Sequence, residues 1–71
     1  MVTIKIGKKG LTDNIIKEIN LQLEKRGMVK VKMLRSFRSE KDKRELVDEI
    51  KAKVKGKLVD LRGFVLTFER C

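Results

Sequence analysis

A Gly-Lys-Lys-Gly segment stands near the start of the sequence, and its residue types are suited to holding a phosphate group. Gly7 and Gly10 allow the backbone to approach an anion closely and to adopt a positive φ. Lys8 and Lys9 place two ammonium charges between them. Thr12 can then act as a helix N-cap, and the open N–H groups of a helix N-terminus attract anions. We therefore interpret the segment as a phosphate-binding loop, because a tight turn alone needs one glycine and no lysine pair.

The G-x-x-G spacing by itself is a weak signal, since it also describes a glycine-rich turn whose lysines are only solvated. The segment lacks the Lys-Ser/Thr ending of a Walker phosphate loop and the third glycine of a dinucleotide fingerprint. The strand-like residues before it and the capped helix after it favour the phosphate-binding interpretation over a simple turn.

The charge balance points in the same direction. The 71 residues include 19 Lys and Arg against 10 Asp and Glu, a net charge of +9, and the excess lies mainly in residues 1–44. Such an excess predicts attraction to polyanions, with nucleic acid first and an anionic membrane surface second. The alternative is a charged coat that only keeps the protein in solution.

Two lysines alternate with apolar residues in the strand-like segment "VKVKM". Lys30 and Lys32 should therefore lie on the open face of a sheet together with Lys5, where they either line a phosphate path or form an ordinary solvated face.

The segment "LRSFRSEKDKR" is the most basic part of the chain. Arg35 and Arg38 flank Phe37, and arginine matches phosphate geometry while an aromatic ring can stack on an unpaired base. Packing of Phe37 beneath the second helix is the alternative, and we favour it slightly.

The periodicity of apolar residues predicts six elements in the order β-α-β-α-β-β. The predicted boundaries are a strand at 2–6, a helix from the Thr12 cap to Gly27, a strand at 29–33, a helix from a Ser39 cap to Gly56, a strand at 57–61, a turn at Arg62-Gly63 and a strand at 64–68.

This order predicts one domain, residues 1–71, with the fold of a two-layer α/β sandwich. Right-handed crossovers place both helices on one face of a four-stranded mixed sheet, and the other face meets water. The loops after the first two strands leave the carboxyl ends of parallel strands. We therefore expect the Gly-Lys-Lys-Gly loop and the Arg35–Arg38 loop at the same edge of the sheet.

The same periodicity predicts the core. Phe64, Leu66 and Phe68 share a face, which favours core packing over base stacking, whereas Leu21 points away from its helix's apolar stripe and should be exposed. The predicted helix stripes are Ile15, Ile16, Ile19 and Leu23 in the first helix and Leu46, Val47, Ile50 and Val54 in the second.

Several kinds of chemistry find no support in the sequence. The chain has no histidine and a single cysteine, Cys71, so we predict no disulfide, metal site or cofactor. The carboxylates show no inward-facing pair, and we predict a non-enzymatic protein without a small-molecule substrate. The absence of an apolar span or leader predicts a cytoplasmic protein that does not bind membranes.

Two segments carry a resemblance to a known family. The stretch "IKIGKKGLTDNIIKEINLQLEKRGMVKVKML" and the later "VDLRGFVLTFER" resemble the YhbY-like proteins, or CRM domains. The resemblance implies the fold of the C-terminal domain of translation initiation factor three and RNA binding through Gly7, Lys8, Lys9 and Gly10. One departure is Glu69, which stands where members often have a tyrosine.

The family's bacterial members associate with precursors of the large ribosomal subunit. The resemblance thus implies a prokaryotic protein in ribosome assembly, with ribosomal RNA or pre-ribosomal particles as partners. We also predict a monomer. An Alba-like archaeal chromatin protein is the second hypothesis, although the two-residue Arg62-Gly63 turn leaves no room for its hairpin arm. A protein-interaction module whose charge serves only solubility is the third.

Overall fold

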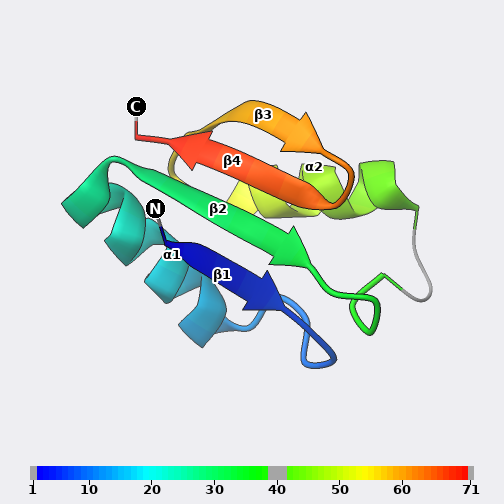
Figure 1. Cartoon of the computed structure of the whole chain (residues 1–71). Coiled ribbons are helices and arrows are strands. Elements are labelled where there is room, and N and C mark those ends of the chain that lie inside the picture. Colours follow the sequence, from blue (N-terminus) through cyan, green and yellow to red (C-terminus); the bar gives the residue numbers. More distant parts are fainter. Residues whose placement is uncertain (1, 39–41, 71) are drawn as a thin grey trace.

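The computed structural model describes residues 2–38 and 42–70 of the chain. Figure 1 shows the predicted β-α-β-α-β-β order, which is confirmed. The elements are β1 (Thr3–Ile6), α1 (Asp13–Arg26), β2 (Met28–Met33), α2 (Lys43–Lys53), β3 (Lys57–Arg62) and β4 (Val65–Glu69).

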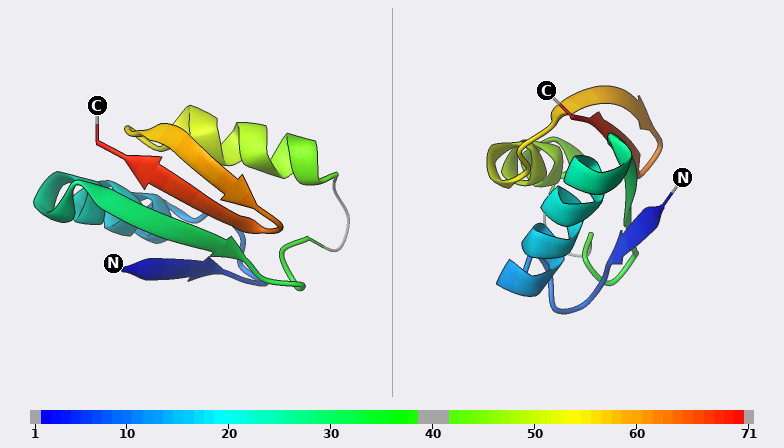
Figure 2. Two further views of the ribbon diagram at one scale, coloured as in Figure 1. Left: turned by 45° about the horizontal axis from the view of Figure 1, so that its top comes forward. Right: turned by 90° about the vertical axis from the view of Figure 1, so that its left-hand side faces the viewer.

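The four strands form one mixed sheet in the order β1-β2-β4-β3. β1 and β2 run parallel, and β4 runs antiparallel to both of its neighbours, β2 and β3. Both helices lie on one side of the twisted sheet (Figure 2). The predicted two-layer α/β sandwich with a four-stranded mixed sheet is therefore confirmed, and the opposite sheet face is open.

The ends of α1 follow the sequence signals. The Thr12 hydroxyl accepts a hydrogen bond from the Ile15 N–H at 3.2 Å, as expected for an N-cap. At the other end Gly27 adopts φ 81°, and its N–H donates to the Leu23 carbonyl oxygen at 2.8 Å. The Thr12 cap fixes where α1 starts after the Gly-Lys-Lys-Gly loop, and the Gly27 cap fixes where it ends.

The predicted boundaries of α2 are wrong at the C-terminal end. The helix ends at Lys53, and Val54 is already extended, with its side chain only 6% exposed in the core. Val54 is β-branched and takes an extended conformation with its side chain in the core. The helical turn that we predicted up to Gly56 therefore does not form. At the other end the N-cap position is occupied by Asp42, whose side chain makes no cap hydrogen bond. The predicted cap, Ser39, lies outside the described residues.

The hairpin turn lies one residue later than predicted. Arg62 still pairs with Val65 in the ladder, so the two turn residues are Gly63 and Phe64. Gly63 has φ 55°, whereas Phe64 does not have a positive φ. Glycine at the first turn position with an ordinary residue at the second is the pattern of a type II′ hairpin. The short turn leaves no hairpin arm.

The core lies between the sheet and the two helices and contains most of the residues that the sequence predicts. Ile15 and Ile16 are only half-buried, because they lie near the open N-terminal end of α1. Leu21 is 40% exposed, as predicted. The buried apolar side chains are Ile6, Ile19, Leu23, Val29, Val31, Met33, Leu46, Val47, Ile50, Val54, Leu66 and Phe68.

Candidate nucleic-acid interface

The Gly-Lys-Lys-Gly segment forms a closed four-residue turn. The Gly10 N–H donates to the Gly7 carbonyl oxygen at 2.9 Å, which puts Lys8 and Lys9 at the tip. Gly10 has φ 71°, so a side chain at this position would be strained. Gly7 does not have a positive φ, and an added Cβ would meet Leu34 Cδ1 at an ordinary 3.4 Å. Of the two glycines, only Gly10 therefore needs glycine's backbone freedom.

Backbone donors remain open at this turn and at the start of α1. No described residue accepts a hydrogen bond from the N–H groups of Lys8, Lys9, Asp13 or Asn14. The Ile15 N–H, in contrast, is already taken by the Thr12 hydroxyl. The Asp13 carboxylate lies in the first helical turn and offsets part of the local positive charge. Open N–H donors and lysines are the groups that attract anions at a helix N-terminus, and phosphate binding at this loop stays a prediction.

The loop after β2 packs directly against this turn. The Leu34 N–H donates to the Ile6 carbonyl oxygen at 2.9 Å. An added Cβ on Gly7 would lie 3.5 Å from Ser36 Oγ, and one on Gly10 would lie 3.7 Å from Phe37 Cε1. The predicted meeting of the two loops at one sheet edge is thus confirmed, and we call residues 7–10 and 34–38 together the loop edge (Figure 1).

Phe37 links the two loops. Its half-buried ring packs against the core and lies beside Gly10. Its backbone N–H donates to the Leu34 carbonyl oxygen at 3.0 Å, which closes a tight turn in the second loop. Because the ring packs against both the core and Gly10, packing explains a phenylalanine at this position better than base stacking does.

The basic side chains of the loop edge differ in how free they are. Lys8, Lys9 and Arg35 are exposed, and no described acidic residue pairs with any of them. Arg38 is different, because its guanidinium carbon lies 3.6 Å from the centre of the Phe64 ring, a cation–π contact. The Arg38 Nε is buried and has no hydrogen-bond partner among residues 2–38 and 42–70. Arg38 therefore connects the loop after β2 to the β3–β4 turn. It is a weaker candidate than Arg35 for contacting a phosphate.

The open sheet face adds a row of cations beside the loop edge. Lys5 pairs with Lys32 across β1 and β2, Lys32 pairs with Val65 across β2 and β4, and Val65 pairs with Arg62 across β4 and β3. Paired residues share a face, so the three cations lie in one row across the sheet. Arg62 also makes an exposed ion pair with Asp60, with 3.2 Å between Nε and Oδ2.

Lys30 lies in the next row, between Thr3 and Thr67. It is exposed, as predicted, but Thr67 pairs with Asp60 on its other side. The positive charge of the open face is therefore concentrated toward the carboxyl ends of β1 and β2, where the loop edge begins.

We did not predict Arg62, Phe64 or Lys43 as part of this site. Arg62 lies in the cation row, and Lys43 Nζ lies 5.3 Å from the centre of the Phe64 ring. The basic character of Arg62 was visible, but its position depends on the register between β2, β4 and β3. That register is set by tertiary pairing and not by the local pattern.

Within residues 2–38 and 42–70 the structure has no cluster of three or more acidic, histidine or cysteine side chains suited to a metal ion. Neither of the described helices has the length and apolar character needed to cross a membrane.

The comparisons with known proteins agree with this architecture. The model of the CRS1 / YhbY (CRM) domain matches residues 1–70, and the chain belongs to this family. A Methanocaldococcus jannaschii protein named "Probable RNA-binding protein MJ0652" is 32% identical over 65 residues, which are 92% of this chain and 48% of that protein. The chain thus spans about half the length of this curated relative.

A solved structure is also similar. The solution structure of SAV1595 from Staphylococcus aureus, described as "a putative RNA binding protein", has a TM-score of 0.70 and 33% sequence identity. The match covers 94% of this chain and 68% of that chain.

Proposed function

We propose that this protein binds RNA and that the loop edge grips its phosphates. The observation that carries the proposal is the contact between the two loops, which brings Lys8, Lys9 and Arg35 to one surface without acidic partners among the described residues. The open N–H groups at the start of α1 add donors beside these charges. A phosphate there gains charge-assisted hydrogen bonds as well as attraction over a longer range.

The sheet face extends this grip. Lys32 lies in one row with Lys5 and Arg62, and Lys30 lies in the next row. An RNA strand that continues from the loop edge can contact these cations. The chain has no Tyr or Trp, Phe68 is buried, and Phe37 and Phe64 pack against the core, so the described strands present no ring on the open face for stacking bases. The proposed contacts are therefore to phosphates, with Arg38 fixing the second loop from behind.

RNA is favoured over duplex DNA as the ligand. The relatives reported above are named "Probable RNA-binding protein" and "a putative RNA binding protein", and the chain belongs to the CRS1 / YhbY (CRM) family. The short β3–β4 turn provides no arm to wrap a duplex. Comparing the affinity for a structured RNA and a DNA duplex of equal length and at equal salt tests this choice, and tighter binding of the duplex would contradict it.

We further propose that the RNA is ribosomal and that the protein acts in large-subunit assembly in the cytoplasm of a prokaryote, as a monomer. The family resemblance supports the ribosomal role. The test is a filter-binding competition between a large-subunit ribosomal RNA fragment and a non-ribosomal structured RNA of the same length. A clear preference for the ribosomal fragment is expected, whereas equal competition would leave RNA binding in place and remove the ribosomal role.

A further inference from the structure

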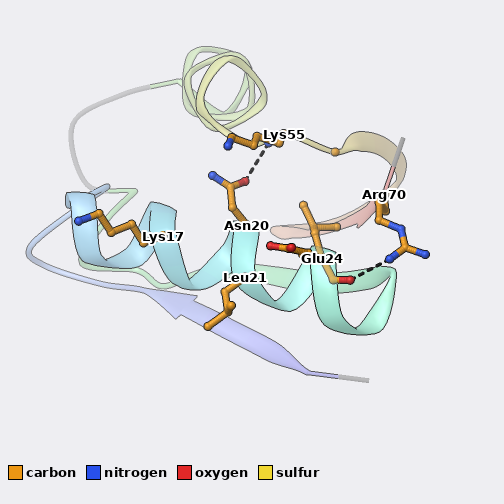
Figure 3. A pocket seen from close by; sticks show the side chains of 8 residues that line it. Lys17, Asn20, Leu21, Glu24, Lys55 and Arg70 are labelled. Atoms are coloured by element: carbon orange, nitrogen blue, oxygen red, sulfur yellow. Dashed lines mark hydrogen bonds between the residues drawn. The ribbon is translucent and has the colours of Figure 1, made fainter.

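The helix layer has a hollow of its own, away from the sheet face. It has a volume of about 570 Å³ and lies between α1 and the segment that joins α2 to β3 (Figure 3). Four of its lining residues follow the i, i+3, i+4, i+7 pattern along one face of α1, namely Lys17, Asn20, Leu21 and Glu24. Lys55 and Arg70 complete the rim. We call this hollow the α1 groove.

Gly56 is closely packed at the base of the groove, where a side chain would not fit without a shift. An added Cβ there would lie 2.6 Å from the Glu69 carbonyl oxygen and 2.9 Å from Leu23 Cδ1. Asn20 Oδ1 accepts a hydrogen bond from the Lys55 N–H at 2.9 Å, which ties the two walls together. The groove is thus built into the fold, with its floor made by backbone and by the buried Leu23.

The polar groups around the groove are mostly donors. Asn20 Oδ1 already accepts one hydrogen bond from the Lys55 N–H, and the Asn20 amide nitrogen offers N–H donors. Arg70 uses one guanidinium nitrogen on the Glu24 carbonyl oxygen at 2.8 Å, as Figure 3 shows, and keeps further N–H donors. Lys17 adds an exposed ammonium, and Glu24 is the one acidic side chain among the lining residues.

An apolar side chain is exposed beside these donors. Leu21 is 40% exposed, and it is one of three large apolar side chains that the described residues leave exposed, with Val59 and Leu61 on β3. The groove therefore combines cationic and donor groups with a leucine available for contact.

We propose that the α1 groove docks an acidic peptide segment of a partner protein, one that carries a bulky apolar side chain to cover Leu21. Carboxylates of such a segment match Lys17, Arg70 and the Asn20 amide, and charge complementarity of this kind steers partners together. An RNA strand fits less well, because unpaired bases stack on aromatic rings and no aromatic residue lines the groove. The inference does not rest on RNA binding at the loop edge, and either can fail alone.

The test uses the whole chain labelled with nitrogen-15 and two fluorescent ten-residue peptides. Both consist of aspartate and glutamate, one with a central leucine and the other with serine in its place. Fluorescence anisotropy should show that the leucine peptide binds at least about fivefold more tightly, because its side chain is removed from water. The leucine peptide should also shift the amide resonances of Asn20, Leu21 and Lys55.

Matched variants then locate the site. Leu21→Glu should weaken binding of the leucine peptide about tenfold. Val59→Glu adds the same charge at a side chain that is 43% exposed, and it should leave the affinity within about twofold of that of the unchanged protein. Equal affinities for the two peptides, or peptide shifts confined to residues 7–10, would overturn the proposal. It is also overturned if a single-stranded RNA shifts the groove amides and displaces the peptide.

Discussion

Replacing Lys8 and Lys9 together with alanine tests whether the turn at the loop edge neutralises phosphates. Both side chains are exposed and make no ion pair with a described residue, so the change should not unfold the protein. Each phosphate neutralised on a single strand contributes about 0.7 to the slope of log affinity against log salt. Losing two contacts should lower that slope by about 1.4.

The same relation gives the expected loss of affinity. If the affinity at 1 M salt is taken as unchanged, the double variant should bind a single-stranded RNA roughly 25-fold more weakly at 0.1 M salt and only roughly threefold more weakly at 0.5 M. Fluorescence anisotropy with a labelled oligonucleotide across this salt range measures both quantities. The free energy of unfolding should be unchanged within about 0.5 kcal/mol, as is usual for surface substitutions.

A matched control removes the same net charge elsewhere. Lys25 and Lys53 are exposed in the last turns of α1 and α2, and both helices begin on the side of the loop edge and run away from it (Figure 1). A Lys25→Ala, Lys53→Ala protein should lose only a fewfold in affinity and keep most of the salt slope. Equal losses in the two double variants would refute the reasoning, because the net charge and not the loop would then determine binding.

Three further predictions concern stability and loop geometry, each measured by chemical denaturation. Gly10→Ala should lower the free energy of unfolding by about 1–2 kcal/mol because of its φ of 71°, whereas Gly7→Ala should cost clearly less, and equal costs would contradict the geometry of the turn. Gly56→Ala should cost about 1–3 kcal/mol, because its Cβ would lie 2.6 Å from a backbone oxygen, and a neutral effect would argue against the closely packed groove floor. A double-mutant cycle of Arg38→Met and Phe64→Leu should give a coupling of about 0.5–2 kcal/mol from the cation–π contact, and additive effects would exclude it.

Much of the fold follows from local patterns. The alternation in "VKVKM" placed Lys30 and Lys32 on the open face, and the Thr12 and Gly27 caps bounded α1 as predicted. The predicted topology also indicated a contact between distant parts of the sequence, because the carboxyl ends of parallel strands lie at the same edge of the sheet. The meeting of the two loops was therefore predictable without any knowledge of side-chain contacts.

Other features depend on tertiary packing and were missed. The end of α2 is set by burial of Val54, which outweighs the local helical pattern. The turn slipped to Gly63-Phe64, and this places the Phe64 ring under the Arg38 guanidinium. Arg38 was predicted to assist RNA binding, and this stays a prediction, but its buried Nε and its contact with the Phe64 ring were not foreseen. The contact between Arg38 and Phe64 joins two segments that are distant in the sequence, and no local sequence pattern in either segment predicts it.

The most direct test of the central claim is a titration of the nitrogen-15-labelled protein with a single-stranded RNA, followed by amide resonances. The proposed phosphate grip predicts the largest shifts at Lys8, Lys9, Asp13 and Asn14, whose N–H groups have no acceptor among the described residues, with smaller shifts at Lys32. Largest shifts along the helix layer, with those four amides unmoved, would contradict the claim that the loop edge holds the RNA backbone.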